Sequence, residues 1–303
     1  MDKKTSTIEV WHKPVLINEV LDYLNPQPGK TYLDVTFGSG GHSHAILEHE
    51  ANCNVIGMDW DALSLETYAP LLQQKFGDRL QIIWGNFAQS YRLLKKAGIK
   101  KVDGILADFG TSYMHIKERP GFSFYLDTPL DMRMSPAHQQ LTAAHVIKTA
   151  SQEKLQEIFF QLGEEKQAKK IAYIIVQKRR EKPIKTTRDL AIIIERVIPR
   201  KGRKIHPATK IFQALRMYIN QELNNISAFL SASLSLLNTT GRLVCISFHS
   251  LEDRLVKQFF KEHEKEGHLQ ILTKKVVVPT KKEIEKNSSS RSAKLRAAIF
   301  MGD

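Results

Sequence analysis

Short apolar runs alternate with segments of helical periodicity along the first third of the chain. The apolar runs at 31–36, 54–59, 80–85 and 102–108 are typical of buried strands, and helical patterns fill the intervals at 42–50, 62–76 and 87–97. Further strands are expected at 241–248, 269–278 and 293–301. This alternation predicts an α/β fold, with parallel strands joined by right-handed crossovers and a mixed seven-stranded sheet overall.

The interval between residues 108 and 242 is far too long for one crossover helix. Most of it has helical periodicity, in the segments 140–149, 151–162, 164–181, 187–197 and 208–237. Thr186 is placed to cap one of these helices. We therefore expect a discontinuous α/β domain, residues 1–136 and 209–303, interrupted by an inserted helical domain at 137–208. The Ser-rich segment 279–291 is expected to be a mobile loop.

Positive charge is concentrated in the expected insertion. The chain has a net charge of +13, and residues 148–210 hold 17 Lys and Arg against 7 Asp and Glu. A concentrated positive field favours a polyanionic partner, although a solvated basic helix face would have the same composition. No apolar run approaches the roughly 20 residues of a membrane span, and no signal-peptide pattern opens the chain. The two cysteines, Cys53 and Cys245, lie near apolar runs and are expected to be reduced core thiols, which favours the cytoplasm.

A glycine-rich loop follows the first strand, in the segment Tyr32-Leu-Asp-Val-Thr-Phe-Gly-Ser-Gly-Gly-His42. Glycines let a backbone approach a ligand closely, and the N-terminus of the next helix offers free N–H groups. The loop lacks the third glycine that dinucleotide sites use around a pyrophosphate, which favours S-adenosylmethionine as the ligand. An NAD-type ligand and a plain strand–helix turn remain open alternatives.

Three acids end strands of the expected sheet: Asp34, Asp59 and Asp108. Ligands of open α/β sheets bind at the carboxyl ends of strands, where the strand order switches, so we expect these acids to converge on one crevice. Asp59 follows the glycine loop at a spacing that suits a carboxylate binding a ribose. The segment Ser247–Arg254 brings Ser, His and Asp together, but triad members come from separated elements, so a polar wall facing substrate is favoured. No Cys/His cluster has zinc spacing, and no metal is expected.

A series of short sequence blocks runs along the chain: His12-Lys-Pro-Val-Leu16, Thr36-Phe-Gly-Ser-Gly-Gly-His42, Asp108-Phe-Gly110, Gly121-Phe-Ser-Phe124, Pro129-Leu-Asp-Met-Arg-Met134, His206-Pro-Ala-Thr209, Phe212-Gln-Ala-Leu-Arg216, Ile246–Arg254 and Arg291–Arg296. In these blocks and in their order the chain resembles the RsmH (MraW) family of ribosomal RNA methyltransferases. The blocks PLDMRM and SFHSLEDR are highly specific, whereas the glycine loop alone is not. The resemblance implies a class I S-adenosylmethionine-dependent methyltransferase fold, which is Rossmann-like, with an inserted helical domain. It also implies methyl transfer to the exocyclic amino nitrogen of a cytidine in the decoding region of 16S rRNA, within the small ribosomal subunit.

The resemblance also implies roles for individual residues. The expected cofactor contacts are Gly40, Gly41, His42, Asp59, Phe87, Asp108 and His115. The first three would lie at the methionine end, Asp59 at the ribose and Phe87 along the adenine. Asp108 would lie near the reacting centre and is the candidate catalytic residue. The basic insertion would bind RNA phosphates, for which the candidates are Arg179, Arg180, Arg200, Lys201, Arg203 and Lys204.

Three positions depart from the family's pattern. Tyr113 and His115 replace a Ser and a Gln, and Pro120 precedes the Gly-Phe-Ser-Phe block. These changes leave room for a non-catalytic RNA-binding protein that keeps a methyltransferase shell. An NAD-dependent oxidoreductase would leave the basic insertion unexplained. A DNA cytosine methyltransferase of the amino type usually carries an Asp/Asn-Pro-Pro-aromatic signature, which is absent after Asp108.

Overall fold

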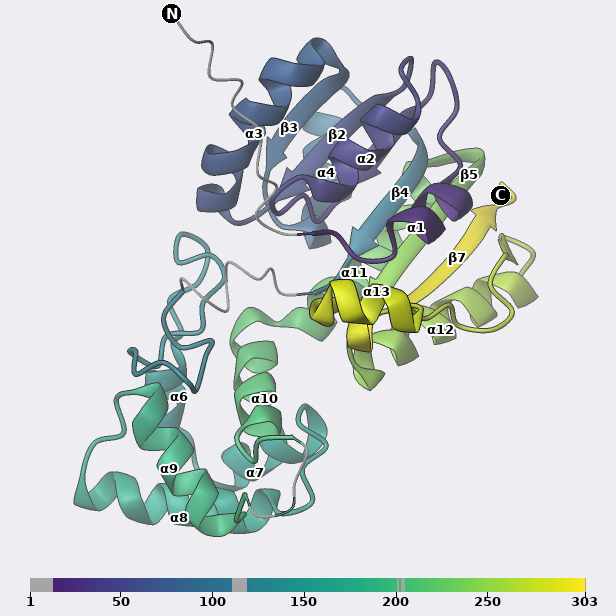
Figure 1. The fold of residues 1–303 in the computed structure, drawn as a ribbon. Coiled ribbons are helices and arrows are strands. Elements are labelled where there is room, and N and C mark those ends of the chain that lie inside the picture. The colour runs from purple at the N-terminus through teal and green to yellow at the C-terminus, as the bar shows by residue number, and fades with distance from the viewer. Residues whose placement is uncertain (1–12, 111–118, 201, 203–204, 303) are drawn as a thin grey trace, which may run out of the picture. The chain divides into compact units, whose positions relative to one another are not determined.

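The computed structural model describes residues 13–110, 119–200, 202 and 205–302 (Figure 1). The contacts within the chain divide it into two compact units. The first, which we call the sheet unit, comprises Met1–Ser112 and Leu223–Asp303. The second, the helical unit, comprises Tyr113–Glu222. Each unit has its own hydrophobic core and is described separately below.

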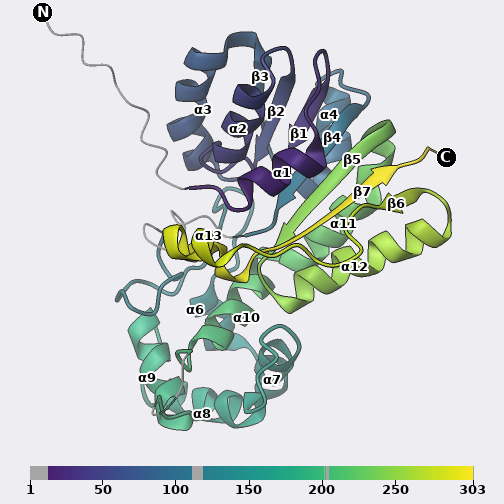
Figure 2. The same cartoon turned by 45° about the vertical axis from the view of Figure 1, so that its right-hand side comes forward.

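The sheet unit is built on a seven-stranded sheet with the strand order β3-β2-β1-β4-β5-β7-β6 (Figure 2). The strands are β1 (Thr31–Asp34), β2 (Asn54–Asp59), β3 (Leu80–Trp84), β4 (Val102–Asp108), β5 (Leu237–Ser247), β6 (Leu269–Ile271) and β7 (Lys294–Phe300). Strands β1 to β5 are parallel, and β7 runs antiparallel to both β5 and β6. The order reverses between β1 and β4, which is the switch point where ligands bind in such sheets. The predicted α/β class I methyltransferase sheet is therefore confirmed.

Helices cover both faces of this sheet. They are α1 (Ile17–Leu24), α2 (Gly41–His49), α3 (Ala62–Phe76), α4 (Ser90–Lys96), α11 (Glu222–Leu236) and α12 (Ser250–Lys265). The helices α4, α11 and α12 bury Leu94, Phe229 and Phe260 in one core with strand residues. On the opposite face, α1 packs on β4 so closely that a Cβ at Gly104 would meet Leu24. Helices on both faces explain why the central strands read as continuous apolar runs rather than alternating ones.

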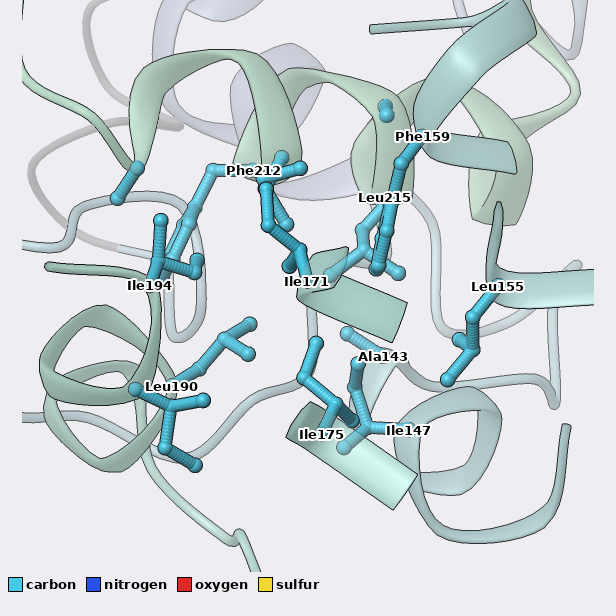
Figure 3. Packing of buried hydrophobic residues seen from close by; sticks show 14 of the residues in the cluster. Ala143, Ile147, Leu155, Phe159, Ile171, Ile175, Leu190, Ile194, Phe212 and Leu215 are labelled. Carbon is cyan, nitrogen blue, oxygen red and sulfur yellow. The ribbon is translucent and has the colours of Figure 1, made fainter. Parts of the chain in front are cut away.

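The helical unit packs its helices around a core of aliphatic and aromatic side chains (Figure 3). The helices are α6 (Ala143–Thr149), α7 (Gln152–Gln161), α8 (Ala168–Glu181), α9 (Thr187–Val197) and α10 (Thr209–Asn220). Ile171 and Ile175 of α8 are fully buried there, with Phe159 of α7. Helix α9 begins with the capping box that the sequence predicts, because the Thr186 hydroxyl accepts from the Asp189 N–H and the Asp189 carboxylate accepts from the Thr186 N–H.

The helical unit extends beyond the insertion expected at 137–208 on both sides. Leu130 and Met132 are buried in its core, and Thr187 donates its N–H to the Thr128 carbonyl at 2.9 Å. Phe212 of α10 belongs to the same core. The sequence boundary was placed by helical periodicity, whereas packing decides which flanking segments belong to the unit. Periodicity misses the irregular segment before α6 because it has no regular spacing.

Three expected elements differ in the structure. The helix expected over 208–237 is broken at Gln221, whose φ of 50° is left-handed, so that α10 ends and α11 begins. The strand expected over 269–278 ends at Ile271, and beyond it only Val277 forms an isolated bridge with Leu295. Strand β5 begins at Leu237, four residues before its expected start. These boundaries depend on tertiary pairing, which local patterns do not carry.

The segment expected to be a mobile loop, 279–291, contains regular structure instead. It forms helix α13 (Lys281–Lys286) and a 3₁₀ turn over Ser288–Ser292. The Glu283 carboxylate accepts from the Leu16 N–H at 2.8 Å, and the Asn287 side chain donates to the Lys13 carbonyl at 2.9 Å. These long-range hydrogen bonds hold the segment against the chain ahead of α1. A composition of Ser and Lys cannot reveal them.

Candidate active site

The three strand-ending acids lie at the carboxyl ends of β1, β2 and β4, as expected, but they differ in environment. Asp34 is only 1% exposed and is held from within the loop. One of its oxygens accepts from the Ser43 hydroxyl at 2.7 Å and the other from the Thr36 N–H at 3.1 Å. Burial raises the pKa of Asp34, and the neighbouring His42 and the hydrogen bonds oppose that rise only in part. Asp34 therefore fixes the loop and the start of α2 rather than facing a ligand.

Asp59 organises the glycine loop across the β1–β2 pair. Its Oδ2 accepts from the Gly38 N–H at 2.7 Å, and its Oδ1 accepts from the Asp61 N–H at 2.9 Å. A carboxylate has about four lone-pair positions, so it can accept more than two hydrogen bonds. Asp61 then caps α3 by accepting from the Leu63 N–H. This placement is compatible with the ribose contact expected of Asp59.

The residue beside Asp59 in the sheet was not singled out by the sequence. Trp84 pairs with Asp59 in the β2–β3 register, is 51% exposed, and donates its indole N–H to the Trp60 carbonyl at 3.0 Å. The sequence signal that could have found Trp84 is a large aromatic residue at the last position of a strand, next to a strand that ends in an acid. Trp84 therefore places an exposed aromatic side chain at the end of β3, next to the end of β2.

The glycine loop is shaped by the packing of the chain itself. Gly40 has φ of +76° and precedes α2, and a Cβ there would lie 2.6 Å from Leu72 Cδ2 and 2.8 Å from Phe37 Cζ. A Cβ at Gly41 would lie 2.9 Å from Pro14 Cδ. Packing therefore requires glycine at the start of α2. The first N–H groups of a helix have no intrahelical partner, so those of α2 are the groups that a polar ligand would contact here.

His42, which is buried, and Asp108, which is half-buried, form a polar pair at the switch point. The His42 Nε2 lies 3.5 Å from the Asp108 Oδ2, longer than the roughly 2.7–2.9 Å of a charge-assisted hydrogen bond. The Asp108 N–H donates to the Thr36 hydroxyl at 2.7 Å, which fixes the end of β4 beside the loop. Among the described residues, both ring nitrogens of His42 and the Oδ1 of Asp108 are buried without a hydrogen-bond partner. Such atoms are costly unless something polar satisfies them, so they indicate a ligand site.

Phe87 lies at the border between this site and the core. It begins a 3₁₀ turn (Phe87–Gln89) after Asn86, whose side chain accepts from the Ala88 N–H. Its ring packs against Phe109 and Phe229, with centroids 5.9 and 5.8 Å away. The ring is half-buried and therefore still has accessible surface. Stacking along an adenine, the role expected from the resemblance, stays a prediction.

Several positions that the sequence analysis singled out lie outside the described part of the chain. These are Tyr113 and His115 after β4, and Lys201, Arg203 and Lys204 in the basic insertion. Of the remaining phosphate candidates, Arg180 and Arg200 are exposed. Pro120 is described, and its carbonyl accepts from the Met132 N–H at 3.2 Å, so the chain at this departure from the family pattern is held against the PLDMRM block.

Arg179 has a structural contact that the sequence did not suggest. Its guanidinium donates to the carbonyls of Ile147 and Ala150, at 2.7 and 2.8 Å, and so caps the end of α6. Burial, helped by the neighbouring Arg180, lowers the pKa of Arg179. A guanidinium that satisfies helix carbonyls is less available to a phosphate than an exposed one. Arg179 is therefore a weaker phosphate candidate than Arg180 or Arg200.

Four of the resemblance blocks meet in the helical unit. Gly121 has φ of +95°, and a Cβ there would lie 2.6 Å from the Met132 N, which explains the glycine of the GFSF block. Phe124 stacks on His206 with centroids 4.4 Å apart and contacts Phe212 edge-on. The GFSF, PLDMRM and HPAT blocks thus pack on the core of this unit together with the FQALR block of α10.

The SFHSLEDR block builds the junction between β5 and α12. Glu252 accepts from the Phe248 N–H at 2.8 Å and forms a capping box with His249. Asp253 binds Arg296 of β7 through both carboxylate oxygens, at 2.7 and 3.1 Å. The Ser, His and Asp residues of this block therefore do not form a catalytic triad. The acids hold helix to sheet, and the polar wall expected for substrate stays a prediction.

A groove of about 710 Å³ lies at the amino ends of the strands, opposite the carboxyl ends that carry Asp34, Asp59 and Asp108. Its lining includes Thr31, Asn54, Arg79, Lys101 and Asn238, which lie at or near the amino ends of the strands. Neither the glycine loop nor the acids contribute to it. Because ligands of this sheet type bind at the carboxyl ends, the groove is not the candidate active site.

The two cysteines lie in the interior of the protein, as the sequence predicts. Cys53 and Cys245 are buried and unpaired, and burial raises the pKa of both thiols. They are therefore core residues, as expected, and not nucleophiles. None of the helices in the described part of the chain combines the length and apolar character needed to cross a membrane.

Comparison with known proteins gives full-length matches. Residues 9–301 match the profile of the MraW methylase family. The chain is 43% identical over 296 residues to the ribosomal RNA small subunit methyltransferase H of Ehrlichia chaffeensis, covering 95% of this chain and 99% of that protein. It is 46% identical over 291 residues to the protein of the same name from Cyanothece sp., covering 96% and 95%. For the Thermotoga neapolitana protein the values are 44% over 294 residues, and 95% of each chain.

Proposed function

The chain belongs to the MraW methylase family, and we propose that it transfers a methyl group from S-adenosylmethionine to the exocyclic amino nitrogen of a cytidine in 16S rRNA. The substrate would be presented in the small ribosomal subunit, in the cytoplasm. The observation that carries the proposal is the pair His42 and Asp108 at the switch point of the sheet. Both ring nitrogens of His42 and the Oδ1 of Asp108 are buried without a partner in the described part of the chain.

The residues at this switch point fit S-adenosylmethionine. Gly40, Gly41 and His42 would hold its methionine end, because the first turn of α2 presents N–H groups suited to a carboxylate. Asp59 would accept from the ribose hydroxyls, and Phe87 would lie along the adenine. When bound, the cofactor supplies an electrophilic methyl group. Gly40 and Gly41 are required by packing at the start of α2, because a Cβ there would meet Leu72 or Pro14.

Asp108 is proposed to orient the nucleophile. The amino nitrogen of cytosine is a poor nucleophile, because its lone pair is conjugated with the ring. An acceptor that holds one amino hydrogen can turn the lone pair toward the methyl group, and it stabilises the positive charge that develops on nitrogen. Among the described residues nothing hydrogen-bonds the Oδ1 of Asp108, and the backbone of Asp108 is fixed through Thr36. The proton can leave after the transfer, so no strong base is required.

The helical unit is proposed to bind rRNA through its basic surface. Residues 148–210, which carry most of the positive excess, lie inside this unit. Arg180 and Arg200 are exposed and can reach phosphate oxygens, while Arg179 is engaged with α6. A reactive base must leave its stack to be methylated, which favours a single-stranded or exposed rRNA segment.

The test is methyl transfer to small subunits that lack the modification, read by mass spectrometry of the rRNA nucleosides. We expect N4-methylcytidine with the native chain and a loss of about 100-fold or more with Asp108→Ala. Asp108→Asn keeps an oxygen acceptor, so partial activity there would mean that the contact matters more than the charge. Asp78→Asn, an exposed acid far from the switch point, is the matched control.

Two results would contradict the proposal in different ways. Normal turnover by Asp108→Ala would show that Asp108 has no catalytic role, but the proposed methyl transfer would stand. No binding of S-adenosylmethionine to the native chain in calorimetry would favour the non-catalytic RNA-binding alternative, which the departures at Tyr113 and His115 left open.

A further inference from the structure

Two histidines and a glutamate meet at the C-terminus of α12, outside the proposed active site. His263 lies in the last turn, Glu266 follows the helix, and His268 precedes the edge strand β6. Strand β6 is separated from β4 by β5 and β7, so the cluster lies away from the acids of the switch point. All three residues belong to the sheet unit. The proposed methyl transfer does not use them.

The backbone brings these side chains together through a Schellman motif. The His268 N–H donates to the His263 carbonyl at 2.9 Å, and the Gly267 N–H donates to the Glu264 carbonyl at 3.2 Å. Gly267 supplies the left-handed φ of +84° that the motif requires. In such a motif the side chains three positions before the cap and two after it come into contact, commonly as an apolar pair. Here His263 and His268 occupy those two positions.

The ligand atoms have the spacing of one face of a coordination tetrahedron. The His263 Nδ1 lies 2.8 Å from the Glu266 Oε2, and the His268 Nδ1 lies 3.4 Å from that same oxygen. The two Nδ1 atoms are 3.4 Å apart. For metal–ligand bonds of about 2.0–2.1 Å, tetrahedral ligands lie about 3.3 Å from one another. The cluster therefore needs little rearrangement to surround one ion.

The surroundings hold the cluster in place while leaving it accessible. The His263 ring packs edge-on against Phe259 with centroids 4.4 Å apart. The His268 carbonyl accepts from the Met301 N–H at 2.9 Å, so its backbone is held on both sides. The side chains of His263, Glu266 and His268 are 26%, 55% and 39% exposed. An ion can reach these atoms from solvent.

We propose that His263, Glu266 and His268 bind one divalent transition-metal ion of the Zn²⁺ type, with water in the fourth position. Imidazole nitrogens suit Zn²⁺, Co²⁺ and Ni²⁺, whereas Mg²⁺ and Ca²⁺ prefer all-oxygen ligands. Because the ligands come from α12 and from the turn into β6, the ion would fasten the helix end to the sheet edge. The site is structural and separate from the proposed reaction. The sequence did not indicate this metal site, because it has no Cys/His motif with zinc spacing. The H-x-x-E-x-H pattern brings its three side chains together only where a helix ends within it.

The test uses the full chain without an oligohistidine tag, freed of metal by a chelator. Titration with ZnCl₂ in competition with a chromogenic chelator is expected to show one saturable site. CoCl₂ is expected to give the visible absorption of a four-coordinate ion. His268→Ala and Glu266→Gln each remove one ligand and are expected to weaken Zn²⁺ binding by about tenfold or more. His49→Ala, an exposed histidine at the end of α2, is the control and should bind as the native chain does.

Circular dichroism and chemical unfolding of each variant show whether it is folded, and Glu266→Gln keeps the shape of the side chain. No saturable Zn²⁺ binding, or binding that is equal in the native chain, His268→Ala and Glu266→Gln, overturns the proposal. In that case the three side chains are only a hydrogen-bonded helix end. The result is independent of methyl transfer, because neither outcome changes the residues at the switch point.

Discussion

At the scale of single residues, Asp34 and Asp59 show that one sequence signature can lead to two environments. Each ends an apolar parallel strand, and each was expected at the same crevice. Asp34 is enclosed and accepts from Ser43 and Thr36, whereas Asp59 accepts from the Gly38 N–H of the glycine loop. The difference arises because α2 covers the end of β1, which only the packing of the helix reveals.

Gly40 allows the effects of backbone strain and steric clash to be separated. Gly40 and Gly98 have nearly equal left-handed φ values, +76° and +78°, but a Cβ at Gly98 would meet nothing within 4 Å. We expect Gly98→Ala to lower the free energy of unfolding by about 1 kcal/mol, the cost of the left-handed conformation. Gly40→Ala should cost clearly more and should also weaken S-adenosylmethionine binding. Urea denaturation and calorimetry of the two variants check this, and equal costs would rule out the clash.

Asp131 of the PLDMRM block predicts a pH dependence of stability. It binds the Arg133 guanidinium through both oxygens, at 2.7 and 2.8 Å. Partial burial would raise the pKa of Asp131, but the hydrogen bonds and charge of Arg133 outweigh it and lower the pKa. A lowered folded-state pKa means that the stabilisation is complete above the ordinary value of about 3.9 and is lost as the pH falls through the folded value.

We therefore expect the native chain to be more stable than Asp131→Asn at neutral pH, and the difference to shrink as the pH falls below about 4. Urea denaturation of both proteins over that pH range measures it. Asp22→Asn, an exposed acid in α1, serves as the control. A difference between the native chain and Asp131→Asn that stays constant with pH would show that the ion pair does not stabilise the fold.

At the scale of elements, most helix bounds were predicted to within a few residues, and the exceptions depend on tertiary contacts. The capping box of α9 is written in neighbouring residues, Thr186 and Asp189, so the sequence contains all of it. The end of α10 at Gln221 and the end of β6 at Ile271 depend on what the chain packs or pairs with next. Helix α13 depends on Glu283 meeting the backbone of Leu16, 267 positions away. Local patterns carry the first kind of signal but not the second.

The cap of α9 gives a direct measurement at this scale. We expect Thr186→Ala to lower the free energy of unfolding by about 1 kcal/mol, because the Asp189 N–H loses its acceptor and the helix loses its first fixed turn. Thr149→Ala, at the exposed end of α6, is the control, since its hydroxyl only bonds back to the His145 carbonyl. A cost for Thr186→Ala no larger than that of the control would mean that packing alone holds α9.

At the scale of the whole molecule, the uneven charge is the property with the widest consequence. The double substitution Arg180→Ala/Arg200→Ala is expected to weaken rRNA binding and to reduce its dependence on salt. The slope of log affinity against log salt should fall by about 0.7–0.9 for each lost phosphate contact. Lys257→Ala/Lys261→Ala on α12 removes the same charge from an exposed face of the sheet unit and is the control. Equal slopes for both double variants would remove Arg180 and Arg200 from the interface.

The sequence by itself determined the class of the sheet, most strands and helices, and the positions of the glycine loop and of the acids. These depend on periodicity, caps and turn residues, which are properties of neighbouring positions. It did not determine that Arg179 caps α6, or that Asp34 is enclosed while Asp108 keeps a buried oxygen without a partner among the described residues.

The tertiary structure alone decided those points, together with the bounds of the helical unit and the meeting of His263 with His268. Each depends on atoms that approach one another through space. Solvent exclusion and hydrogen-bond partners follow from that approach, and they fix whether a polar side chain supports the fold or is left to bind a ligand.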